Sequence, residues 1–248
     1  MPGENYYLLT ALPSLGTLGS KPPLSPAELR EKVEGAGDAT SLVDAMLLAD
    51  DLLQREALLA GELDEPLPSV LTAAQVRDEQ PLPEYLRIEL EETSQPLVPA
   101  DALWAKYFHY VKDLAGRLGS ELLADWVGFE VALRNAMVRA RAKALDLEAT
   151  KYIVAPELTD PLADFDALLS DWSNAANPLA AQRVLDTARW KWINFNDRWF
   201  SFSNDELVAY TAKLLLLHRW YRVAQAEGED ENQSPASNAN DIDERNQP

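Results

Sequence analysis

The stretch Ser120–Leu147, SELLADWVGFEVALRNAMVRARAKALDL, decides the fold, because it predicts one long amphipathic helix. Its apolar residues recur every three or four positions, which places them on one face of an α-helix. Basic residues gather in its second half, with no acid between Glu130 and Asp146. A helix of this length and pattern indicates a protein built by helix packing. The apolar face consists of Leu122, Trp126, Phe129, Leu133, Met137, Ala140 and Ala144.

Helix signals continue on both sides of this stretch. Ser25-Pro26-Ala27-Glu28 has a capping serine, a proline at the first helical position and a glutamate three residues after the serine, which together predict a helix start. Ser203 and Glu206 predict a second capping box. The four prolines between Gly61 and Pro83 predict a loop. Helices are expected from Ser25 onward, over residues 40–59, 83–93, 99–118 and 120–147, up to 174 after Pro161, and over residues 178–195 and 203–226.

These signals predict an all-α helical bundle in three parts. Residues 1–97 form an N-terminal helical region with a proline-rich loop, and residues 98–226 form the bundle. Residues 227–248 carry seven acids and one base and almost no apolar side chain, so we expect a disordered acidic tail. The tail is either a solvated chain end or an interaction arm.

The composition excludes several kinds of function. The net charge is −19, which disfavours binding to nucleic acid and to anionic lipid headgroups. Without cysteine there is no disulfide, thiolate or Cys-ligated metal site. No GxxxxGK[ST] or GxGxxG motif occurs, so we expect neither nucleotide nor cofactor binding. Met1–Thr10 lacks the pattern of a signal peptide, and no apolar run approaches the ~20 residues of a membrane span, so a cytoplasmic protein is expected.

The basic residues of the central helix are candidates for a partner interface. The helical period places Arg134 and Arg141 beside the apolar stripe and Arg139 on nearly the opposite side. Two interpretations stay open. Arg134 pairs with Glu130 one turn before it, which would give a local contribution of about 0.3–0.5 kcal/mol, or the arginines contact a partner.

Aromatic residues between Arg189 and Phe202 are the second group of candidates. Trp190, Trp192 and Trp199 alternate there with basic residues, and Trp and Arg are enriched at interface hot spots. The alternative is a helix–loop–helix corner that closes the core. The two histidines, His109 and His218, fit the margin of a core better than a ligand or general-base role.

Three blocks of the sequence resemble a family of bacterial proteins encoded in V-type ATPase operons, whose members stand in for the C (also called d) subunit of these enzymes. The blocks are Asn5–Pro13 with Lys21–Ser25, Trp126–Arg141, and Glu206–Trp220. The resemblance implies a connector between the central stalk and the membrane rotor ring, held at the inner membrane through the complex. The chain is shorter than three-bundle C subunits, so a reduced version of their helical funnel is expected.

Three hypotheses follow from these observations. The first is a non-catalytic connector subunit of a V-type ATPase, with the stalk and ring subunits as partners. The second is a free-standing helical adaptor that binds a protein or peptide in a groove. The third is a hydrolase or metal enzyme assembled from scattered carboxylates with His109 or His218. The interface candidates are Arg134, Arg139, Arg141, Trp190, Trp192 and Trp199.

Overall fold

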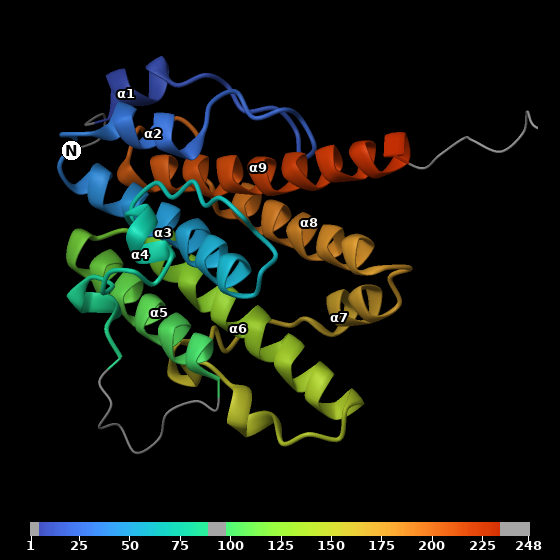
Figure 1. Cartoon of the computed structure of the whole chain (residues 1–248). Helices are drawn as coiled ribbons and strands as arrows, with labels where there is room; N and C mark the ends of the chain where they lie inside the picture. The colour runs from blue at the N-terminus through green and yellow to red at the C-terminus, as the bar shows by residue number, and fades with distance from the viewer. Residues whose placement is uncertain (1–4, 89–97, 234–248) are drawn as a thin grey trace, which may run out of the picture.

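A computed structural model describes residues 5–88 and 98–233, and within them the predicted all-α fold is confirmed (Figure 1). These residues form α-helices joined by turns, short 3-10 helices and loops, and no strand occurs among them. The α-helices are α1 Tyr6–Ala11, α2 Pro26–Val33, α3 Asp38–Leu59, α4 Ala73–Val76, α5 Pro99–Leu118, α6 Glu121–Ala144, α7 Asp166–Ser173, α8 Pro178–Asn196 and α9 Asn204–Gln233. The 3-10 helices are η1 Glu84–Leu86, η2 Ala149–Tyr152 and η3 Pro156–Leu158.

The predicted boundaries of two helices are explained by their caps. Before α2, the Ser25 hydroxyl accepts from the Glu28 N–H at 3.2 Å, and the Glu28 carboxylate accepts from the Ser25 N–H at 2.6 Å. Between α5 and α6, Gly119 has a φ of 68°, a left-handed conformation that glycine adopts without strain. The hydroxyl of Ser120 then caps α6 by accepting from the Leu123 N–H. The expected break at Gly119–Ser120 is therefore the turn that joins α5 to α6 in a helical hairpin.

The proline-rich region differs from its prediction in two places. The loop contains the short helix α4, which begins with a capping box formed by Thr72 and Gln75. The prediction of a helix over residues 83–93 is wrong for residues 83–88, which the structure describes. Only Glu84–Leu86 make a 3-10 turn there, and the next two residues are extended or irregular. Leu86 is fully buried there and Tyr85 stacks on Tyr110, so contacts with α5 override the local helix signal. Residues 89–93 lie outside the described part.

The last helix is longer than expected. α9 continues past the predicted end at Ala226 to Gln233, so the first part of the predicted acidic tail is helical. Residues 234–248 lie outside the described residues. The capping box predicted at Ser203 is also corrected. The Glu206 carboxylate accepts from the N–H groups of Phe200 and Phe202, at 3.1 and 2.7 Å, and so binds the preceding loop.

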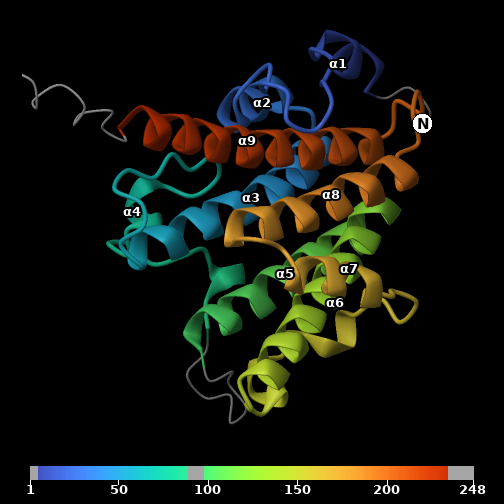
Figure 2. The ribbon, with the colours of Figure 1, turned by 90° about the vertical axis from the view of Figure 1, so that its right-hand side faces the viewer.

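Helix α9 is central to the molecule. It lies between α1 and α2 on one side and α3 and α8 on the other, while the α5–α6 hairpin and α7 form the opposite part of the protein (Figure 2). Its Leu216 belongs to the main core with side chains of α3, α5 and α6, and its Leu214 packs in a second core with α2 and α3. The predicted boundary at residue 97 therefore does not separate two hydrophobic cores.

Candidate functional site

A groove of about 940 Å³ opens between α3, α5, α6, α8 and α9, and we call it the central groove. It follows α3 from Met46 to Ala57, a length of about 16 Å at the rise of an α-helix. Most of its lining is apolar and aromatic, and it also contains five arginines and four acids. The charged lining residues are Arg134, Arg141, Arg189, Arg219, Arg222, Asp50, Glu62, Asp101 and Glu130.

The inner part of the central groove holds a network of buried charges. Arg189 of α8 donates to Glu130 of α6 at 2.6 and 3.0 Å and to Asp186 at 3.2 Å. Arg219 of α9 donates to the same Asp186 oxygen at 3.1 Å. Burial alone would lower the pKa of Arg189, but the two carboxylates outweigh it and raise that pKa. The Arg189 guanidinium therefore stays ionised, and the network links α6, α8 and α9.

The outer part of the groove presents guanidinium groups. Arg222 of α9 donates to Asp50 of α3 at 2.9 Å, and its side chain is 54% exposed against 11% for Asp50. Arg134 of α6 donates to Asp101 of α5 at 2.8 Å, with 31% exposure against 12%. In both pairs the acid lies deeper than the arginine. A molecule entering the groove therefore meets the guanidinium groups of these pairs, together with the exposed carboxylate of Glu62, in a chain with a net charge of −19.

The arginines of α6 separate as their spacing predicts. Arg134 and Arg141 line the central groove, whereas the exposed Arg139 is not among its lining residues. The Arg141 guanidinium lies over the Trp172 ring at 5.1 Å, and that of Arg134 lies over the Trp104 ring at 5.3 Å. The alternative Glu130–Arg134 pair is wrong, because Glu130 binds Arg189 and Arg134 binds Asp101.

The three candidate tryptophans have different environments. Trp192 stacks on Phe129 at 5.1 Å and lies 5.4 Å from Trp126, within the packing between α6 and α8. Trp190 packs against the main core. These two positions favour the core-closing interpretation. Trp199 differs, since it is 64% exposed in the α8–α9 connection.

Trp199 belongs to a second surface, which we call the aromatic tip. Its members come from α1 and from the end of α8 with the following loop, and all are exposed: Tyr6, Tyr7, Phe195, Trp199 and Phe200. Such a concentration of exposed rings is typical of an interaction site.

The loop of the aromatic tip is fixed by internal contacts. Phe200 and Phe202 have φ values of 60° and 50°, a left-handed conformation that is strained for aromatic residues. Glu206 accepts from both of their N–H groups. Lys213 of α9 binds Asp197 at 2.6 Å and lies 4.5 Å from the Trp199 ring centre. The loop is thus held in a conformation that leaves its largest rings facing solvent.

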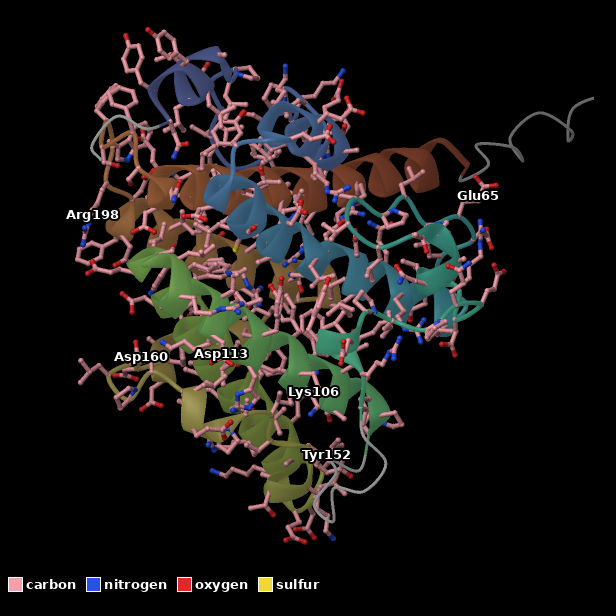
Figure 3. All side chains as sticks on the ribbon, turned by 90° about the vertical axis from the view of Figure 1, so that its left-hand side faces the viewer. Glu65, Lys106, Asp113, Tyr152, Asp160 and Arg198 are labelled. Carbon is pink, nitrogen blue, oxygen red and sulfur yellow. The ribbon has the colours of Figure 1, made fainter. Side chains whose placement is uncertain are left out.

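The two surfaces have no residue in common, although α8 contributes both Arg189 of the groove and Phe195 of the tip. The tip loop immediately precedes α9, whereas the central groove includes α9 as far as Val223. In Figure 3, Arg198 of the tip loop is well separated from the groove residue Tyr152.

The two histidines have separate hydrogen-bond partners and do not form a site with the carboxylates that the structure describes. His109 is half exposed and binds Glu157 at 2.8 Å, rather than packing into the core, and His218 bonds to the Leu24 carbonyl at 2.7 Å. Within the described residues, no cluster of three or more His, Asp or Glu side chains is arranged to hold a metal ion.

No helix in the described part of the chain has the length and apolar character needed to cross a bilayer.

Several groove residues were not predicted. Asp50, Arg219 and Arg222 line the groove and Asp186 binds two of its arginines, and these four residues come from three different helices. The available signal was the spacing of three between Asp186 and Arg189 and between Arg219 and Arg222, which places each pair on one helix face. Which faces meet depends on the packing of the helices.

Residues 54–234 match a family model described as "Protein of unknown function (DUF2764)". Because the match covers well over half of the chain, the protein belongs to this family. A search of curated proteins finds no match, and a search of solved structures finds none either.

Proposed function

We propose that this member of the DUF2764 family is a non-catalytic connector subunit of a V-type ATPase. The observation that carries the proposal is the presence of two separate candidate interaction surfaces on one helical body, the central groove and the aromatic tip. A connector must hold two partners at once, and this arrangement suits that task. The resemblance of the three sequence blocks to proteins encoded in V-type ATPase operons supplies the identity of the partners.

In this proposal the central groove holds a helix of the central stalk and the aromatic tip contacts the membrane ring. Helical segments commonly bind between helices by laying an apolar face into a groove. Exposed aromatic rings supply contact area with few rotatable bonds, so they lose little entropy when a partner covers them. The buried Arg189–Glu130 and Arg219–Asp186 pairs join α6, α8 and α9, which stiffens the body between the two surfaces.

The test is an affinity purification of the tagged full-length protein from mildly solubilised membranes of the cell that encodes it. We expect the catalytic, stalk and ring subunits to co-purify in fixed ratio. Phe195→Ser together with Phe200→Ser should reduce recovery of the ring, and Arg141→Glu should reduce recovery of the stalk. Arg139→Glu, on the other side of α6, is the matched control and should change neither. If the ATPase is expressed but does not co-purify, the connector proposal fails.

A second candidate is the free-standing helical adaptor. It is favoured by the aromatic and arginine-rich lining of the central groove, which fits a protein segment without identifying its source. In the same purification, an adaptor would recover another protein through the groove, with loss on Arg141→Glu, and the ATPase would be absent.

A further inference from the structure

We propose that the central groove receives an amphipathic helix with an acidic margin, whose apolar face covers the groove and whose carboxylates bind the outer arginines. This inference rests on the proposed function, since it assigns the groove to a protein segment and names the chemistry of that segment. It is argued from charge complementarity, from the shape of the groove and from the elements that line it.

The charge argument begins with the depth of the ionic pairs. Asp50 and Asp101 are nearly buried and already accept from Arg222 and Arg134, so their oxygens are screened from an incoming molecule. The exposed part of each pair is the guanidinium, which has further N–H groups to donate. Arg141 adds a third guanidinium, which lies on the α6 wall with Arg134 and is stacked over Trp172. Planar guanidinium groups fixed on aromatic rings are well placed for bidentate binding of carboxylates.

The lining indicates that the occupant is helical. Helices form most of the groove walls, and no sheet edge is present among the described residues, so addition of an extended strand has no backbone to pair with. An apolar path of about 16 Å along α3 matches about three turns of a helix. Arg222 stands on one wall, from α9, and Arg134 and Arg141 on another, from α6, so acids on both margins of an apolar stripe would meet them.

The proposal predicts selectivity for the sign of charge. The probe is a labelled, stapled amphipathic helix of about five turns, with leucines along one stripe and glutamates on both flanks. A matched probe has lysine in place of every glutamate. Fluorescence anisotropy with the full-length protein measures both affinities. We expect the glutamate probe to bind at least about tenfold more tightly, with a preference that weakens as salt is raised.

Variants locate the binding to the groove. Arg141→Glu and Arg222→Glu should each weaken the glutamate probe about tenfold or more, whereas Arg139→Glu should leave its affinity unchanged. Circular dichroism verifies that each variant is folded. Equal binding of the two probes, tighter binding of the lysine probe, or equal effects of Arg139→Glu and Arg141→Glu would overturn the proposal.

Other occupants give distinct results. If the glutamate probe binds only after Asp241, Asp243 and Glu244 are neutralised, the groove belongs to the protein's own acidic end and the inference is wrong. A dimer that Arg141→Glu dissociates would assign the groove to a second copy, and the inference would again be wrong.

If ATPase subunits co-purify but the two probes bind equally, the connector proposal stands and this inference fails. If the probes are distinguished but the ATPase does not co-purify, the acidic-helix chemistry stands and the connector proposal fails.

Discussion

Arg189 of α8 holds Glu130 of α6 with two hydrogen bonds, from Nε at 2.6 Å and from Nη2 at 3.0 Å. The arginine side chain is only 15% exposed and that of the glutamate 18%. Because Asp186 binds both Arg189 and Arg219, two guanidinium groups balance two carboxylates in this network. The packing of α6 against α8 therefore depends on charges that are removed from water.

Removal of this guanidinium should strongly destabilise the protein. Arg189→Met leaves Glu130 buried without its cation, so we expect the free energy of unfolding to fall by about 3–5 kcal/mol. Urea denaturation followed by circular dichroism measures the change. Arg198→Met is the matched control, since it breaks an Arg–Glu pair whose side chains are 68% and 73% exposed, and such pairs contribute about 1 kcal/mol or less. Equal losses in the two variants would contradict the buried network.

The carboxylate of Asp51 should make stability depend on pH. It accepts from the N–H groups of Ser69, Val70 and Leu71, each at 2.7 Å, and so fastens the proline-rich loop to α3. Burial raises the pKa of Asp51 to about 6, with the three backbone donors opposing that shift. As pH falls, the folded state therefore takes up a proton at a higher pH than the unfolded state does. The stabilisation from this group is complete below the unfolded pKa and is lost as pH rises through 6.

The comparison with Asp51→Asn isolates this effect. Between pH 7 and pH 5 the free energy of unfolding of the native protein should rise by about 1 kcal/mol relative to that of the variant, which cannot titrate at this position. Urea denaturation at both pH values gives the change in unfolding free energy with pH for the native protein and for Asp51→Asn. Parallel pH dependences would show that the carboxylate keeps its ordinary pKa in the fold.

Truncation of Trp192 should destabilise the protein more than truncation of Trp199. Trp192→Ala removes a ring stacked on Phe129 and packed beside Trp126, so a loss of about 3 kcal/mol in unfolding free energy is expected. Trp199→Ala removes an exposed ring, and we expect a loss of about 1 kcal/mol or less. Thermal and urea unfolding measure both. A larger loss for Trp199 than for Trp192 would contradict their placements.

Phe200 should show a conflict between stability and binding. Its φ of 60° is strained for phenylalanine, so Phe200→Gly should relieve the strain and raise the unfolding free energy by about 1 kcal/mol. The same change removes a ring of the aromatic tip, and recovery of ring subunits in the affinity purification should fall. Phe195→Gly is the control: it removes another exposed tip ring but lies in helix α8, where glycine costs about 1 kcal/mol. Destabilisation by both glycines would argue against strain at Phe200.

Local signals predicted the helices well, and the site only in part. Ser25 with Glu28 and the Gly119 break depend on neighbouring residues alone, so the sequence was sufficient to place them. The helical period likewise separated Arg141 from Arg139. The central groove depends on which faces of α3, α6, α8 and α9 meet, and no local signal specifies that Asp186 receives Arg219 or that Asp50 receives Arg222. Glu206 had the spacing of a capping box, but the loop conformation directed it to Phe200 and Phe202.

The contact of α1, α2 and α3 with α9 has a consequence for synthesis on the ribosome. Val43 and Leu47 of α3 pack in one core with Leu207 and Leu214, so helices that are translated early pack against one that is translated much later. Until α9 leaves the exit tunnel, the part of the α2 and α3 faces that packs on α9 has no native surface to cover it, and such nascent chains are exposed to aggregation and to chaperones. Premature termination before residue 204 would therefore damage the region that was made first.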